Sequence, residues 1–92
     1  MTMVTSPNTV CTRGIEEMIA RDPEYIKLIH ECLVRHTLGD WGELCDDDKA
    51  MNDAALEEAG YILSAYTVKD TKIWIITDAG WKVTTILLPR EY

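Results

Sequence analysis

The hydrophobic pattern of the chain changes at Gly60, and this change constrains the fold more than any other feature. After it come three runs rich in β-branched and aromatic residues, the composition of strands. These runs are residues 61–68, 72–77 and 82–88. The connections 69–71 and 78–81 are short enough for hairpins. Pro89 ends the last run because proline cannot donate to a β-ladder. The second half of the chain therefore predicts a three-stranded antiparallel meander.

The first half has helical spacing instead. Asp22 is a favoured N-cap, and the Pro23-Glu24 pair suits a first helical turn. A helix is therefore predicted over residues 23–36. Its apolar residues form one stripe, as expected for a helix that packs on a core: Tyr25, Leu28, Ile29, Cys32 and Leu33. A shorter helical segment is predicted around residues 15–19.

A further helix is predicted from Asp46 or Asp47 to Ala59, with Gly60 as the residue that ends it. The fold class that follows is α+β, with two to three N-terminal helices followed by the three-stranded meander in two layers. Residues 1–12 mix Thr, Ser, Asn and Pro without periodicity and are predicted to be a flexible tail. Residues 13–92 are predicted to form a single domain.

Composition limits the setting of the protein. No run of 18 apolar residues is present, and the N-terminus lacks the pattern of a secretory signal. We therefore expect a cytoplasmic protein that does not enter a membrane. Cys11, Cys32 and Cys45 contain no Cys-x-x-Cys pair, so two are expected in or near the core and one in the tail. No metal or cofactor is expected.

The negative charge is gathered in one segment. The formal net charge is −7, and residues 40–58 account for all of it, with eight acids against Lys49 alone. The acids are Asp40, Glu43, Asp46, Asp47, Asp48, Asp53, Glu57 and Glu58. Such a field favours a basic partner and repels nucleic acid at a distance. A basic protein surface is therefore the expected partner, and direct nucleic-acid binding is disfavoured.

Residues 36–42, His-Thr-Leu-Gly-Asp-Trp-Gly, form the leading candidate loop. One interpretation is a constrained loop that presents Asp40 and Trp41 to a partner. The other is a structural corner, in which Trp41 fills the edge of the core, the glycines take positive φ, and Asp40 accepts loop N–H groups. Together with the acidic segment, the loop gives the predicted binding residues: His36, Gly39, Asp40, Trp41, Gly42, Glu43, Asp46, Asp47, Asp48 and Asp53.

From His36 onward the chain resembles a family of short proteins encoded on plasmids and other mobile elements of bacteria. Members are labelled plasmid-related or small restriction-subunit-like proteins. The shared pieces here are His36, residues 39–42, Asp48, Asn52, Gly60, residues 64–66 and 72–77, and residues 84–89 with 91–92. Members commonly have an acidic residue followed by arginine in the second hairpin turn, where this chain has Gly80-Trp81. The resemblance implies a mobile-element setting and brings no established activity.

Other chemistries fit parts of the same region. Cys32 and His36 have the i, i+4 spacing of metal ligands, and Cys45 with Asp40 would complete a tetrahedral site. His36 and Asp40 also suit a base and its orienting carboxylate, with Cys32, Cys45 or Ser64 as nucleophile. Residues 46–48, three aspartates, resemble a divalent-cation site but lack the EF-hand pattern.

The preferred functional prediction is a non-enzymatic binding protein of a mobile element. In its concrete form it is an anti-restriction or anti-CRISPR-like inhibitor that engages a basic surface of a nucleic-acid-handling host protein. The first alternative is a small metal-dependent hydrolase, nuclease or toxin that uses His36, Asp40 and residues 46–48. The second is a self-associating structural protein, a homodimer paired through the strand 83–88.

Overall fold

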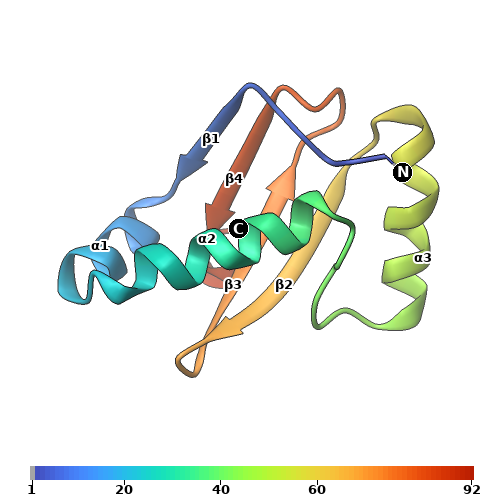
Figure 1. The fold of residues 1–92 in the computed structure, drawn as a ribbon. Coiled ribbons are helices and arrows are strands. Elements are labelled where there is room, and N and C mark those ends of the chain that lie inside the picture. The colour runs from blue at the N-terminus through green and yellow to red at the C-terminus, as the bar shows by residue number, and fades with distance from the viewer. Residues whose placement is uncertain (1) are drawn as a thin grey trace.

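A mixed four-stranded sheet forms the centre of the molecule, with strand order β1-β4-β3-β2 (Figure 1). The computed structural model describes residues 2–92. β2, β3 and β4 form an antiparallel meander, and β1 pairs parallel to β4. The strands are β1 Asn8–Cys11, β2 Ile62–Val68, β3 Thr71–Thr77 and β4 Val83–Leu87.

The predicted α+β class is confirmed, but the predicted three-stranded, wholly antiparallel sheet is wrong. The fourth strand, β1, lies within residues 1–12, the segment expected to be a tail, and it precedes all the helices. It has four residues, of which Asn8, Thr9 and Val10 are exposed, so its sequence carries little of the alternation typical of strands. Its pairing depends on the backbone of β4, more than 70 residues later in the chain, which the local sequence does not reveal.

The strand β4 is internal to the sheet. It has β3 on one side and β1 on the other. Pairing of residues 83–88 across a homodimer would therefore require β1 to leave its place.

Two helices cover one face of the sheet, and a third stands beside the β2 edge (Figure 1). The covering helices are α1, Arg13–Arg21, and α2, Glu24–Thr37, and the third is α3, Asp46–Ala55. Two short 3₁₀ segments follow α3 and β4, at Leu56–Glu58 and Pro89–Glu91. No helix in residues 2–92 is long and apolar enough to cross a membrane.

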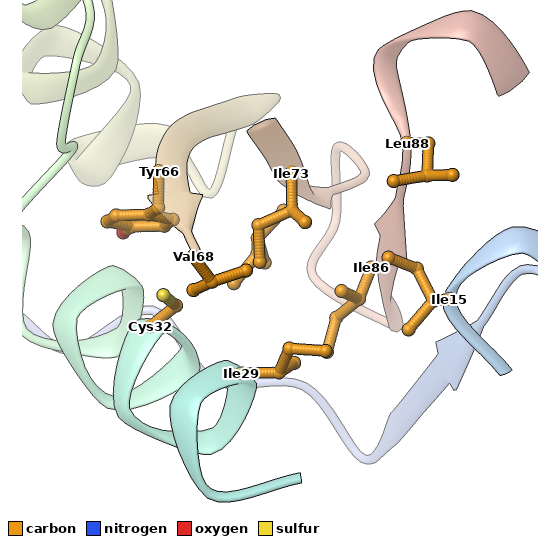
Figure 2. Packing of buried hydrophobic residues seen from close by; sticks show 9 residues of the cluster. Ile15, Ile29, Cys32, Tyr66, Val68, Ile73, Ile86 and Leu88 are labelled. Carbon is orange, nitrogen blue, oxygen red and sulfur yellow. The ribbon is translucent and has the colours of Figure 1, made fainter. Parts of the chain in front are cut away.

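The main core lies between the two covering helices and the sheet (Figure 2). Ile15 of α1 and Ile29 of α2 are at most 4% exposed. The predicted stripe of α2 is confirmed, since all five of its residues belong to this core or pack against it. The sheet and the segment after it contribute Tyr66, Val68, Ile73, Ile75, Ile86 and Leu88.

A smaller cluster attaches α3 to the rest of the molecule. Buried Val4, Trp41 and Ile62 form its centre, and Leu44, Ala55, Leu56 and Trp81 pack against them. Val4 comes from the predicted tail, and its N–H donates to Thr37 O at 2.9 Å. α3 is therefore held by residues far apart in the sequence.

The C-terminus is fastened to the start of α1 by one carboxylate. Glu91 accepts hydrogen bonds from the Thr12 hydroxyl at 2.5 Å, from Gly14 N at 2.9 Å and from Leu88 N at 2.9 Å. The hydrogen bond from Thr12 is the main reason that the pKa of Glu91 is lowered. Glu91 thus satisfies two otherwise free N–H groups at the ends of separate elements.

The residue that ends the α3 region is Ala59 and not the predicted Gly60. Ala59 has the left-handed conformation, φ 49° and ψ 45°, and its carbonyl accepts from Gly80 N at 2.7 Å. Gly60 N donates to Ala55 O at 2.9 Å, and Gly60 O accepts from the Trp81 indole. The turn is therefore one residue earlier than the position of the glycine suggested.

This geometry predicts that Ala59→Gly stabilises the protein. Glycine takes the left-handed region without the steric cost that a Cβ carries, about 1 kcal/mol, so we expect a gain of roughly 0.5–1 kcal/mol. Urea unfolding measures it. The control is Ala54→Gly, at an exposed position inside α3, which should cost about 1 kcal/mol. Destabilisation by both changes would contradict the assigned backbone conformation.

Candidate interaction face

The Gly-Asp-Trp-Gly loop, residues 39–42, covers the open edge of β2. Glu43 N donates to Ala65 O at 2.7 Å, and Ala65 N donates to Trp41 O at 3.2 Å. Gly42 pairs with Ala65 as an isolated parallel bridge. A Cβ on Gly42 would lie 2.0 Å from Ala65 O, so only glycine allows this approach. The loop satisfies backbone groups that an uncovered edge strand would expose to other chains.

The aromatic and carboxylate side chains of the loop bond to other residues of the same protein. Trp41 is 4% exposed, and its indole N–H donates to Asp53 Oδ1 at 2.9 Å. Asp40 pairs with Arg35 at 2.7 Å and accepts from Gly42 N at 3.1 Å. The hydrogen bond from Arg35 lowers the pKa of the Asp40 carboxyl. The structural-corner interpretation is therefore confirmed in each part, including positive φ at Gly39 and Gly42.

Arg35 pairs with a residue beyond its own helix. Glu31 and Arg35 have the i, i+4 spacing of a helical ion pair, but Arg35 reaches beyond the helix end to Asp40 instead. Its guanidinium also lies 4.7 Å from the centre of the Tyr66 ring, and the Tyr66 hydroxyl donates to Asp40 O at 2.7 Å. These contacts fix the loop at its first turn.

His36 is buried in the core and not presented to a substrate. The side chain is 1% exposed, and its ring nitrogens lie 2.7 Å from Ser64 Oγ and 2.9 Å from Thr77 Oγ1. Thr77 continues the network to Thr84 at 2.8 Å, and Thr84 to Ser6 at 2.8 Å. Burial lowers the pKa of His36 to about 4, so the ring is neutral near pH 7.

This environment gives no support to a catalytic role for the histidine. Ser64 is fully buried and bonded to His36, so it has no access to a substrate. Asp40 is engaged with Arg35 rather than with the imidazole. Within residues 2–92, no three His, Cys, Asp or Glu side chains are grouped so as to hold a metal ion. Residues 46–48 form the exposed first turn of α3.

The three cysteines are free and separate. Cys32 is buried and Cys11 is half-buried against the main core, whereas Cys45 is exposed. The predicted place of Cys32 is confirmed, but the predicted tail thiol is wrong, because Cys11 packs against the main core and the exposed thiol is Cys45. Burial is the main reason that the pKa values of Cys11 and Cys32 are raised, which makes both poor nucleophiles.

The acidic side chains of residues 40–58 face solvent. All eight are exposed, and in the ion pairs of the described chain Asp40 is the one member of this set that takes part. Asp53 accepts the indole N–H of Trp41, and Glu43 accepts the Thr67 hydroxyl at 2.9 Å. We call the six exposed carboxylates of α3 and the 3₁₀ turn after it the acidic face: Asp46, Asp47, Asp48, Asp53, Glu57 and Glu58.

Beside the acidic face lies a hollow that sequence analysis missed. It has a volume of about 360 Å³ and lies between α3 and the start of β2. We call it the α3 groove, and it is lined by Leu44, Asp48, Met51, Asn52, Ala55, Tyr61 and Leu63. Met51 is 71% exposed and Tyr61 is 42% exposed. The signal in the sequence was Met51, a large apolar residue on a helix that is otherwise acidic and alanine-rich.

The structure divides the predicted binding residues into those that hold the fold together and those that face solvent on α3. His36 and Trp41 are buried, and Gly39 and Gly42 set backbone geometry. Asp40 and Glu43 are exposed, but Asp40 pairs with Arg35 of α2 and Glu43 accepts a hydrogen bond from Thr67 of β2. The remaining members, Asp46, Asp47, Asp48 and Asp53, belong to the acidic face next to the α3 groove.

Comparison with other proteins adds no family to this picture. No protein-family model matches the chain, and neither a curated protein nor a solved structure matches it.

Proposed function

We propose that this is a small binding protein that acts in the cytoplasm for a bacterial mobile element. In this proposal the acidic face engages a basic surface on a host protein that handles nucleic acid, and so inhibits it. The protein acts by binding its partner and does not catalyse a reaction. The mobile-element setting comes from the resemblance of residues 36–92 to the plasmid-encoded family.

The observation that carries the proposal is that the carboxylates of the acidic face are exposed and outside ion pairs. Within the described chain, none of the six side chains of the acidic face is in an ion pair, and all are exposed. Charges held on one side of a small domain repel one another, which lowers its stability. The segment 40–58, which contains these six carboxylates, accounts for the whole net charge of −7, because the rest of the chain carries eight acids and eight bases.

The number of charges along α3 and the turn after it also fits a nucleic-acid-handling partner. α3 and the 3₁₀ turn after it extend for about 20 Å, from the rise per residue of the two helix types. One strand of B-DNA carries about six phosphates over that length, at one per 3.4 Å. The acidic face carries six carboxylates over the same length. A partner surface that binds a phosphate backbone would thus meet a similar density of negative charge on the acidic face.

The test is affinity capture from bacterial lysate at about 50 mM salt, followed by titration of the captured protein. We expect a nucleic-acid-handling protein whose affinity falls steeply with salt, since its basic groups lose their electrostatic attraction. The triple variant Asp47→Asn, Glu57→Gln, Glu58→Gln should weaken binding about tenfold or more and make the salt dependence shallower. Nucleic acid should compete with the unmodified chain for the same partner.

The matched control is Glu16→Gln, Glu17→Gln and Glu31→Gln, three exposed acids on α1 and α2. It removes charge away from the acidic face and should leave affinity within about twofold, because exposed charges more than a Debye length apart are screened. Equal weakening by control and triple variant would reduce the interaction to net charge alone. Capture that recovers no nucleic-acid-handling protein would contradict the proposal.

A further inference from the structure

The α3 groove is apolar and preformed. Its walls come from Leu44, Met51, Ala55, Tyr61 and Leu63, and its volume of about 360 Å³ is at the lower end of the range of ligand pockets, about 300–1,000 Å³. Two of these walls are large side chains that remain well exposed, Met51 and Tyr61. Exposed apolar surface gathered around a hollow is typical of an interaction site.

The polar groups of the groove define what it selects. The Asn52 amide donates to Leu63 O at 2.8 Å and accepts from Leu63 N at 3.4 Å, so it is engaged with the β2 backbone. The charged group of the lining is the exposed Asp48 carboxylate, which belongs to the acidic face. The groove therefore offers an apolar floor and an anionic border, a combination complementary to an apolar side chain between cationic ones.

The mode of docking follows from the edge of β2. Asn52 bonds to Leu63, and the Gly42 loop bonds to Ala65 on the same strand. A partner segment cannot add to these backbone groups as a further strand. It has to bind by inserting a side chain, with its charges placed along α3.

We propose that the α3 groove receives one large apolar side chain, such as leucine, from a basic segment of the protein partner, with lysine or arginine on either side of it. This inference rests on the proposed function and names the chemistry of the partner. The acidic face then attracts the segment, and the groove decides which basic segments bind tightly. Met51 is an adaptable wall, since methionine fits side chains of different shapes.

The experiment uses the full chain and two labelled nonapeptides of alternating lysine and arginine, with leucine or alanine at the centre. The leucine peptide should bind about tenfold tighter, the effect of burying the larger side chain, and the preference should persist as salt rises. Met51→Ser should reduce the preference to about threefold or less, because the groove loses one of its apolar walls. Ile26→Ser, at a 57% exposed position on α2, is the control and should leave the preference unchanged.

A second readout is the NMR signal of the Met51 methyl group, which should shift with the leucine peptide and not with the alanine peptide. Equal binding of the two peptides, binding of neither, or an undiminished preference in Met51→Ser would overturn the inference. So would a concentration-dependent dimer that Met51→Ser dissolves, because the occupant would then be a second copy. Failure of the proposed function has a different readout: the affinity for both peptides would then change neither with salt nor in the triple acidic variant.

Discussion

Replacing Gly42 by alanine is expected to destabilise the protein by about 3 kcal/mol or more. Two costs combine at this position. A residue with a Cβ at φ +73° pays about 1–2 kcal/mol for the left-handed conformation. The Cβ would also lie 2.0 Å from Ala65 O, and relieving such an overlap costs about 1–3 kcal/mol. Since Ala65 O is backbone, the contact is relieved only by moving the loop away from β2, which breaks the hydrogen bond from Glu43 N.

Gly80→Ala separates these two costs. Gly80 has φ +90°, but a Cβ there meets nothing within 4 Å. It should therefore cost only the conformational part, about 1–2 kcal/mol. Chemical denaturation of both variants measures the difference, and hydrogen exchange at Ala65 N should rise in Gly42→Ala alone because its acceptor, Trp41 O, moves with the loop. Equal losses of stability would show that the close approach of Gly42 to β2 does not exist in solution.

Patterns that depend on neighbours in the sequence predicted the fold well. The stripe of α2 and the Asp22-Pro23-Glu24 start gave a helix within one residue of the observed Glu24–Thr37. The two-residue turn Lys69-Asp70 closes β2 and β3 with both residues at positive φ, as hairpin turns with right-handed twist require. β1 could not be predicted in this way, because four residues with three exposed positions depend on a strand more than 70 residues later.

The candidate site was predicted in its charges but not in its shape. Exposure of acids on a helix follows from their solvation, so residues 46–48 could be placed on the surface from sequence alone. The loop 39–42 could be interpreted either as an interaction loop or as a structural corner. The choice depended on where Trp41 points, which its packing with Val4 and Ile62 decides. The α3 groove likewise exists only because α3 and β2 meet at one edge.

The burial of His36 could not be predicted from the sequence either. Its environment predicts a marked loss of stability in mild acid. The ring sits among hydroxyl groups, with Ser64 on one nitrogen and Thr77 on the other, and its plane lies edge-on to Trp41 at 6.1 Å. A neutral imidazole can donate through one nitrogen and accept through the other, and the hydroxyls can adopt either role. Among the described residues no carboxylate is paired with the ring, so a protonated His36 would be a buried charge without a counter-ion.

The sign of the pH effect follows from the lowered pKa. An ordinary histidine pKa is 6.5, and that of His36 is about 4 in the folded protein. The unfolded chain therefore binds a proton more readily, so stability is fully present above pH 6.5 and is lost as the pH falls to about 4. The pKa difference corresponds to a loss of about 3 kcal/mol. Urea unfolding between pH 7 and pH 5 isolates most of this effect, because carboxyl groups with ordinary pKa values of 3.8 to 4.5 titrate mainly below that range.

The variant that tests the assignment is His36→Gln, which keeps a donor and an acceptor but does not titrate. It should lower stability at pH 7 by about 1–3 kcal/mol, because glutamine fits the hydroxyl pair imperfectly. Its stability should then stay nearly constant from pH 7 to pH 5. His30→Gln, at an exposed position on the same helix, should keep the slope of the unmodified protein. If that slope survived in His36→Gln, the acid sensitivity would belong to another group, and the buried neutral histidine would not be its source.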